Sequence, residues 1–119
     1  MAREPNVIVY RGEIYYANLS PSQGSEQGGF RPVVILQNNT GNRHAPTTII
    51  APLTTQFGKR LMPTHVELEE GCGIQHRSLI LLEQIRTISK SRLSDKIGAV
   101  PPDTMVKVDQ AIKISMGVS

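Results

Sequence analysis

Short apolar runs separated by turn-forming residues occupy most of this 119-residue chain and constrain its fold more than any other feature. The runs are rich in β-branched and aromatic side chains, and glycine, proline and asparagine lie between them, as in short strands joined by turns. Because so many short strands would leave exposed edges in a flat sheet, we expect them to close into a small β-barrel. Strands are predicted at residues 13–19, 33–37, 47–54, 65–68, 79–82, 85–88 and 96–100.

The pattern changes after residue 100, where apolar residues recur at helical spacing. They are Met105, Val108, Ala111, Ile112 and Met116. Pro101 and Pro102 favour the start of a helix here, and Gly117 favours its end. The fold class predicted from the residues is therefore mainly β, with one C-terminal helix whose apolar stripe closes the barrel.

Two prolines and one polar cluster mark places where the predicted strands are interrupted. Pro32 is expected to open the strand that follows it, a position where a missing N–H is tolerated. Pro52 is expected to mark a bulge or an unpaired edge. Residues 38–42 are rich in asparagine and are predicted to form a turn.

The length fits a single domain at residues 8–119, preceded by a loose leader at residues 1–7. No apolar run is long enough for a membrane span, and the first residues lack the apolar core of a signal peptide. The single cysteine, Cys72, cannot form a disulfide within the chain, so a reducing cytoplasm is the expected compartment. Cys72 and His76 alone do not make a zinc site, and we expect no metal and no cofactor.

Basic residues gather in stretches that contain no acidic residue. Between Glu26 and Glu67 lie four basic side chains and no acidic one: Arg31, Arg43, Lys59 and Arg60. Basic segments are typical of proteins that bind a polyanion, although most such runs form a solvated face. Charge alone therefore leaves nucleic-acid binding as one of two interpretations.

A glycine-rich loop at residues 24–30 leads into Arg31, Pro32 and an apolar run at residues 33–36. Pro32 biases Arg31 towards extended geometry, so a cation is held on a stiff strand beside a flexible loop. A planar, permanently charged guanidinium suits an anionic ligand, with phosphate as the leading candidate. A surface hairpin with an arginine at its edge explains the same residues, and the local sequence leaves both interpretations open.

Polar residues also stand at the ends of two predicted strands. Thr54 ends the strand at residues 47–54, and a hydroxyl at a barrel rim can donate to a phosphate oxygen. Glu83 and Gln84 follow a run of four apolar residues, with Arg86 close behind. The alternatives are a threonine that simply favours a strand end and an ordinary exit of the chain at the surface.

Together these segments resemble the MazF, Kid and PemK family of bacterial toxins, the ribosome-independent mRNA interferases, and within it the EndoA type. The resemblance extends from about Val9 to the C-terminal helix, and several motifs occur in the family order. It is carried by residues 11–15, 24–33, 37–38, 54, 63–66 and 81–88. The resemblance implies an SH3-like barrel, of the CcdB and MazF type, that forms a homodimer.

The resemblance also implies an activity, which is sequence-specific cleavage of single-stranded mRNA without a metal ion. The catalytic arginine and threonine of the family fall on Arg31 and Thr54. These side chains are expected to stabilise charge while the 2′-OH of the RNA itself attacks the phosphorus. No side chain can be assigned as the general base, and Glu26 is a candidate only because it lies near Arg31 in sequence.

The predicted RNA-binding residues come from the family loop, the basic stretches, the strand ends and the aromatic side chains. They are Ser25, Glu26, Gln27, Phe30, Phe57, Lys59, Arg60, Glu83, Gln84 and Arg86. For Phe30 and Phe57, stacking on bases and filling of a barrel end are equally open. A cognate MazE-like antitoxin is the other implied partner, with a disordered acidic tail that suits the basic stretches.

Two alternatives place a different activity on the same barrel, because a fold does not determine a function. One is a CcdB-like toxin that poisons DNA gyrase without cutting, and the other is a toxin that only sequesters RNA. The gyrase poisons use a C-terminal tryptophan, and this chain has no tryptophan. That difference, with Arg31 and Thr54 in place, favours the ribonuclease.

Overall fold

The structure is a computed structural model that describes residues 8–58 and 60–119. The predicted leader at residues 1–7, and Lys59, lie outside the described residues. The strands are β1 (Glu13–Asn18), β2 (Phe30–Ile35), β3 (Thr47–Thr54), β4 (His65–Leu68), β5 (Ser78–Leu81), β6 (Arg86–Ser89) and β7 (Leu93–Ala99). The helices are α1 (Asn39–His44) and α2 (Pro102–Met116), with 3₁₀ turns η1 (Leu82–Gln84) and η2 (Lys90–Arg92).

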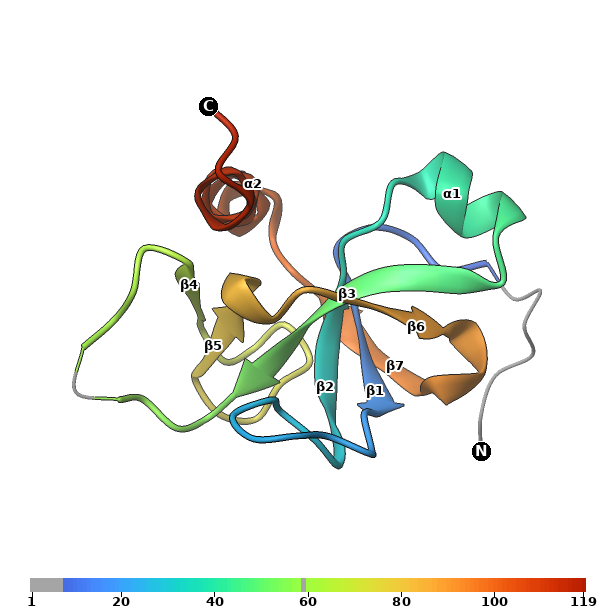
Figure 1. The fold of residues 1–119 in the computed structure, drawn as a ribbon, viewed down its shortest axis with the longest axis horizontal. Helices are drawn as coiled ribbons and strands as arrows, with labels where there is room; N and C mark the ends of the chain where they lie inside the picture. The colour runs from blue at the N-terminus through green and yellow to red at the C-terminus, as the bar shows by residue number, and fades with distance from the viewer. Residues whose placement is uncertain (1–7, 59) are drawn as a thin grey trace.

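The seven strands form one strongly curled antiparallel sheet (Figure 1). Its order is β4-β5-β3-β2-β1-β7, and β6 pairs with β3 beside this path. Helix α2 packs against β4 and η1 at one end of the sheet, and α1 lies at the opposite end of β3 (Figure 1). Among the described strands no ladder joins β4 to β7, so the sheet is barrel-like without closing completely. The prediction of a mainly β, SH3-like fold with a C-terminal helix is confirmed.

Strand β3 is the longest strand and changes partners along its length. Its first half, up to Ile50, pairs with β6, whereas Leu53 and Thr54 pair with β5. Pro52 lies between these two ladders and faces Val33 of β2 on the other side. The expectation of a bulge or unpaired edge at Pro52 is therefore met in part: one edge of Pro52 pairs with β2, and on its other edge neither ladder includes it, so no partner needs the missing N–H.

Strands β1 and β2 bury apolar residues on both faces of the sheet. Ile14 and Val34 belong to the core cluster that α2 covers through Val108. Tyr15 and Val33 point the other way, into a second cluster. This arrangement explains the continuous apolar run at residues 33–36, because a strand covered on both sides has no reason to alternate with polar residues.

Several boundaries differ from the sequence prediction, most clearly at α1, β2 and β7. The predicted turn at residues 38–42 opens α1, because the Asn38 side chain accepts a hydrogen bond from the Gly41 backbone N–H (2.7 Å) and caps the helix. Strand β2 begins at Phe30, so Pro32 lies inside the strand and does not open it. Pro32 pairs with Tyr16 of β1, and the ladder between β2 and β3 starts at Val33. Strand β7 begins before the predicted residue 96.

Helix α2 lies where the sequence places it, at Pro102–Met116, and ends at Gly117 in the left-handed conformation (φ 70°). Val108 and Ala111 are buried against the sheet. Met116, which the helical pattern assigns to the same apolar stripe, is 64% exposed. The stripe that closes the barrel therefore ends before the last turn of the helix.

Candidate active site

Arg31 extends from β2 over the point where β3 leaves its ladder with β2. Its Nε donates to the Gly28 carbonyl (2.8 Å), and its Nη1 donates to the Leu53 carbonyl (3.4 Å). Both partners are neutral backbone oxygens, and no ion pair among the described residues includes Arg31. The guanidinium is thus held in place with its charge uncompensated, and donors remain for a ligand.

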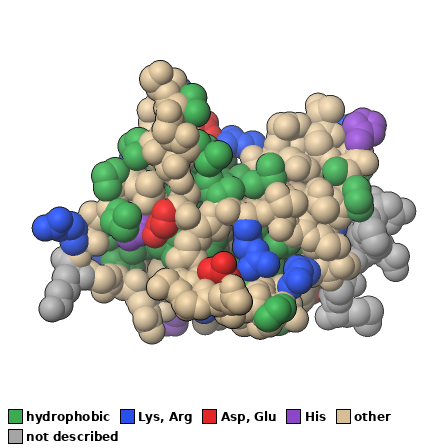
Figure 2. Space-filling model, in the orientation of Figure 1, with side chains coloured by type: hydrophobic (Ala, Val, Ile, Leu, Met, Phe, Trp, Pro, Cys, Tyr) green, Lys and Arg blue, Asp and Glu red, His purple; other side chains and the backbone are tan. Residues whose placement is uncertain are grey.

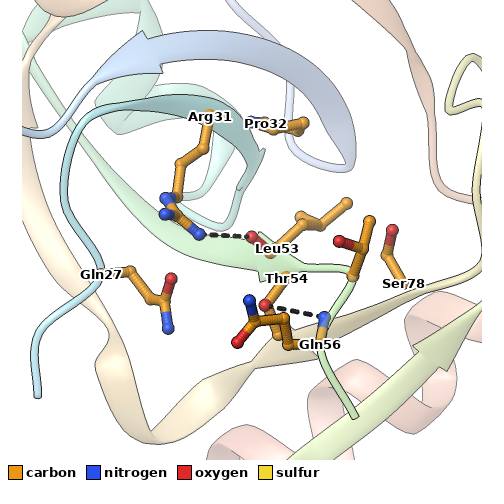
Figure 3. Close-up of a pocket in the computed structure, with 8 residues that line it drawn as sticks. Gln27, Arg31, Pro32, Leu53, Thr54, Gln56 and Ser78 are labelled. Carbon is orange, nitrogen blue, oxygen red and sulfur yellow. Dashed lines mark hydrogen bonds between the residues drawn. The ribbon is translucent and has the colours of Figure 1, made fainter.

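Thr54 ends β3 on the opposite wall of the same cleft (Figure 3). Its Oγ1 accepts a hydrogen bond from the Gln56 backbone N–H (3.1 Å), which leaves the hydroxyl hydrogen free to donate elsewhere. The cleft between Arg31 and Thr54 has a volume of about 320 Å³, and Gln27 and Ser78 line its two sides (Figure 3). An arginine and a threonine hydroxyl that face one small cleft are donors suited to the oxygens of a phosphoryl group.

A second hollow of about 390 Å³ adjoins this cleft through Gln27, which lines both. The other residues lining it that the sequence predicted to bind RNA are Glu26, Glu83, Gln84 and Arg86. Arg86 is held by its Nη1, which donates to the Leu19 carbonyl (3.4 Å). Seven of the predicted site residues, Glu26, Gln27, Arg31, Thr54, Glu83, Gln84 and Arg86, are therefore gathered in two connected hollows.

Gln84 connects the glycine-rich loop to the barrel. Its Oε1 accepts from the Gln27 backbone N–H (2.8 Å), and its Nε2 donates to the Ser25 carbonyl (3.3 Å). Glu26 is occupied within the loop, since its Oε1 accepts from the Gln23 backbone N–H (2.9 Å). Glu26 does not line the Arg31 cleft, so the structure does not bring this candidate base to the site.

Glu83 is oriented by two neighbours that sequence reasoning gave no role. Its Oε1 accepts from the Thr64 hydroxyl (3.2 Å), and its Oε2 lies 2.9 Å from Nε2 of His65. Nδ1 of His65 accepts from the Met62 backbone N–H (3.1 Å), so Nε2 carries the ring proton and donates to Glu83. The carboxylate at the edge of the second hollow is fixed through both of its oxygens.

The aromatic residues lie apart from the Arg31 cleft. Phe30 is 63% exposed, its ring centroid lies 6.2 Å from that of Tyr16, and it lines a separate hollow with Arg92. Phe57 lies under the Arg77 guanidinium, 4.4 Å from the ring centroid. Phe30 is therefore not a core residue. The exposed Arg60 lines neither of the two connected hollows.

Ser78 and Gln56 complete the cleft and were missed by the sequence analysis. Ser78 reaches the site because its neighbour Leu79 pairs with Thr54 across the β3–β5 ladder. No local pattern indicates this pairing, and only knowledge of the strand register would have found it.

No three His, Cys, Asp or Glu side chains of the described residues lie close enough together to hold a metal ion. On the face shown in Figure 2, basic side chains are dispersed, with a small group near the centre beside an acidic one. Within the described residues, 8–58 and 60–119, neither helix has the length and apolar character needed to cross a membrane.

The sequence matches, over residues 10–116, the family described as PemK-like, MazF-like toxin of type II toxin-antitoxin system. Endoribonuclease EndoA of Bacillus subtilis (strain 168) is 52% identical over 113 residues, which cover 94% of this chain and 97% of that protein. An endoribonuclease from a mycobacterial species superimposes with a TM-score of 0.78 at 28% identity, covering 97% of each chain.

A mycobacterial endoribonuclease solved in complex with its cognate antitoxin also has a TM-score of 0.78, at 29% identity, and the match covers 93% of this chain and 97% of that one. MazF from Deinococcus radiodurans shares the fold, with a TM-score of 0.81 at 23% identity over 94% of this chain and 99% of that one. The prediction of a MazF-like toxin with endoribonuclease activity is confirmed by these matches. The chain belongs to the PemK-like, MazF-like toxins of type II toxin-antitoxin systems.

Proposed function

We propose that this protein cleaves single-stranded mRNA at defined sequences, without a metal ion, with the scissile phosphate bound between Arg31 and Thr54. The observation that carries the proposal is an arginine whose hydrogen-bond partners among the described residues are backbone carbonyls and which shares a cleft with a threonine hydroxyl. The adjoining hollow, with the fixed Glu83 carboxylate and the Gln84 amide, then receives a neighbouring base.

The nucleophile in this proposal is the 2′-OH of the RNA. Its oxygen forms a bond to phosphorus and loses its proton, while the bond from phosphorus to the 5′-oxygen breaks and that oxygen gains a proton. The products are a 2′,3′-cyclic phosphate and a 5′-hydroxyl. Negative charge grows on the non-bridging oxygens during the step, and preorganised donors such as Arg31 and Thr54 stabilise it most at that moment.

Among the described residues, the cysteine and the histidine nearest the second hollow are both engaged in contacts of their own, which supports the 2′-OH as the nucleophile. Cys72 is half-buried in a turn, and its Sγ contacts the Glu69 carbonyl (3.5 Å) rather than a base. His65 is engaged by Glu83 and by the Met62 backbone. The substrate's own hydroxyl needs no activated side chain, only alignment and charge stabilisation.

The proposal extends to the partners. The protein is expected to act as a homodimer and to be silenced by an antitoxin whose acidic, disordered tail covers the RNA-binding hollows. The mycobacterial relative solved with its cognate antitoxin supports the second expectation. Sedimentation of a monomer at micromolar concentration would contradict the dimer, and simultaneous tight binding of RNA and antitoxin would contradict occlusion.

The proposed chemistry is tested with an oligoribonucleotide that spans one mapped cleavage position. We expect cleavage in EDTA to continue and to leave a 5′-hydroxyl on one fragment. A single deoxyribose on the 5′ side of the cut should stop cleavage while binding stays nearly unchanged, since the phosphates that Arg31 contacts are the same. Cleavage of the deoxy-substituted strand would show that water or a protein group attacks, and RNA that binds but stays intact would support a sequestering toxin instead.

A further inference from the structure

Strands β3 and β5 separate beside the Arg31 cleft, and beyond that point an arginine and an aromatic ring hold the two chain segments together. The last pair of their ladder is Thr54 with Leu79. Phe57 lies three residues after Thr54, and Arg77 lies two residues before Leu79. The guanidinium carbon of Arg77 lies 4.4 Å from the ring centroid of Phe57, within the range of a cation–π interaction.

The segment that carries Arg77 is anchored to the barrel on both sides of this residue. Before it, the backbone approaches β7 so closely that a Cβ on Gly73 would lie 1.9 Å from a carbonyl oxygen of that strand, and Ile74 is buried in the core. After it, Ser78 is 4% exposed, and its hydroxyl donates to the His76 carbonyl (2.9 Å). Arg77 therefore extends from a fixed part of the molecule.

The segment that carries Phe57 holds the hydroxyl of Thr54. The backbone N–H of Gln56 donates to Oγ1 of Thr54 (3.1 Å; Figure 3), so the hydroxyl hydrogen is left to donate to a ligand in the cleft. Thr55 and Gln56 are exposed, and a Cβ on Gly58 would meet no atom within 4 Å. The ring of Phe57, which is partly buried, is therefore the anchor of residues 55–58.

Neither partner of this contact reaches the site directly. Arg77 and Phe57 line neither the Arg31 cleft nor the hollow beside it. No ion pair among residues 8–58 and 60–119 includes Arg77, so no carboxylate of this part of the chain competes with the ring for the cation. An effect on a phosphate in the cleft would therefore pass through the backbone that joins Phe57 to Thr54.

We propose that Arg77 and Phe57 are positioning residues for Thr54. Their contact holds the Gln56 N–H against Oγ1 of Thr54, and this hydrogen bond directs the hydroxyl hydrogen to the ligand. The inference rests on the proposed function, because it takes Thr54 as a donor to the scissile phosphate. It also gives Phe57 a role other than stacking on a base, since Arg77 covers one face of its ring.

The kinetic test measures single-turnover cleavage of an oligoribonucleotide that spans a mapped cleavage position by Phe57→Leu and by Arg77→Met. Loss of an exposed cation–π contact changes an equilibrium constant about two- to fivefold. We expect the maximal rate constant to fall by about this factor and the half-saturating protein concentration to stay unchanged. In a Thr54→Ala background neither substitution should slow cleavage further, because no hydroxyl remains to be oriented.

A second measurement follows the contact without any RNA. The Gln56 amide should exchange with solvent about two- to fivefold faster in Phe57→Leu and in Arg77→Met than in the wild type, as measured by NMR.

Three further variants separate this contact from a general loss of charge or packing. Arg77→Lys keeps the cation and Phe57→Tyr keeps the ring, so both should cleave at close to the rate of the wild type. Arg43→Met is the matched control, because Arg43 is an exposed arginine on α1, at the opposite end of β3 (Figure 1). Its rate constant and its Gln56 exchange should equal those of the wild type.

An unchanged rate constant and an unchanged Gln56 exchange in Phe57→Leu and Arg77→Met would overturn the inference. So would a raised half-saturating concentration at an unchanged rate constant, because these side chains would then bind RNA themselves. Equal slowing in the Thr54→Ala background would also overturn it, since the contact would then act on another part of the cleft. Failure of the proposed function looks different, because Arg31→Ala and Thr54→Ala would then cleave normally.

Discussion

Two arginines of this protein are held in nearly the same way at the backbone and differ only in what their remaining nitrogens contact. Arg31 donates from Nε to the Gly28 carbonyl, and Arg11 donates from Nε to the Leu36 carbonyl, both at 2.8 Å. Nη2 of Arg11 donates to the carboxylate of Asp109 on α2 at 2.5 Å, whereas Nη1 of Arg31 donates to a further backbone carbonyl, that of Leu53.

The difference separates a structural cation from an available one. The charge of Arg11 is neutralised by Asp109, so this arginine joins the barrel to α2 and offers little to an external anion. The charge of Arg31 faces a cleft and is balanced by no acidic side chain of the described residues. We therefore expect mutation of Arg31 to reduce mainly the activity, and mutation of Arg11 to reduce mainly the stability.

The largest effect is expected from Arg31→Ala. Removal of one preorganised donor to a developing oxyanion lowers kcat by about 10²–10³-fold in other enzymes, and the free energy of unfolding should fall by no more than in Arg11→Ala, because two hydrogen bonds to carbonyls are lost here but no ion pair. Single-turnover cleavage of an oligoribonucleotide, together with urea unfolding, measures both quantities. Near-normal cleavage by the folded variant would remove the proposed site, and a stability loss larger than that of Arg11→Ala would break the contrast.

Thr54→Ala should have the next largest effect. Thr54 offers one neutral hydroxyl to the same phosphoryl group, and a hydrogen bond to a charged acceptor contributes about 1.5–3 kcal/mol, so kcat should fall roughly tenfold to a hundredfold. Thr54→Ser keeps the hydroxyl and should retain most of the activity. If Thr54→Ser were as slow as Thr54→Ala, the methyl group rather than the hydroxyl would matter, and the proposed donor role would be wrong.

Arg11→Ala should reverse the pattern that Arg31→Ala shows. It removes the ion pair with Asp109 and the bond to the Leu36 carbonyl, and because the two side chains are 31% and 48% exposed we expect a loss of about 1–2 kcal/mol in unfolding free energy. Cleavage at a temperature where the variant is folded should be unchanged. Asp109→Asn serves as the matched control and should lose less, since the Leu36 bond remains. A fall in kcat comparable to that of Arg31→Ala would show that α2 and the cleft are coupled.

Much of the fold was predictable because its causes are local. Strand runs of β-branched residues, the proline start and glycine end of α2, and the glycine-rich loop before Arg31 are all visible in the sequence. The errors in strand boundaries have one physical origin, which is pairing with distant strands, whereas α1 was missed although its cap at Asn38 is local. Phe30 and Pro32 are drawn into β2 by β1, and Pro52 is accommodated where β3 exchanges β6 for β5.

The candidate site likewise contains residues that the sequence predicts and residues that it does not. The sequence motifs led to Arg31, Thr54, Glu83 and Gln84, which the structure gathers in two connected hollows. Ser78 and the support of Glu83 by Thr64 and His65 were not predicted, because they depend on the register of β5 against β3 and β4. Residues that bind through their own chemistry are visible in a sequence, and residues that matter through their neighbours are not.

Lys90 is a third cation, and no ion pair among the described residues includes it, so it tests whether the lack of an acidic partner alone marks a functional residue. Its Nζ donates to the backbone carbonyl of Asn42, as Arg31 donates to carbonyls, but Lys90 is 1% exposed and lines neither of the two connected hollows. If access to the cleft is what distinguishes Arg31, then Lys90→Met should leave RNA cleavage unchanged. Slower cleavage by Lys90→Met would show that a cation without an acidic partner affects the reaction from outside the cleft.

The smallest expected effect is the pH dependence that Lys90 gives to stability. Burial lowers the pKa of Lys90 in the folded protein below its ordinary value of 10.5, which the unfolded chain retains. Between these two pKa values the unfolded state binds the additional proton, so the unfolding free energy of the wild type relative to Lys90→Met should rise with pH, by at most about 1.4 kcal/mol per pH unit. Below the folded pKa the difference should be constant. Urea unfolding of both proteins from neutral to alkaline pH measures this difference in unfolding free energy. A difference that falls as the pH approaches 10.5 would show that the folded protein stabilises the charged form of the lysine. Lys90 would then be a paired cation, like Arg11.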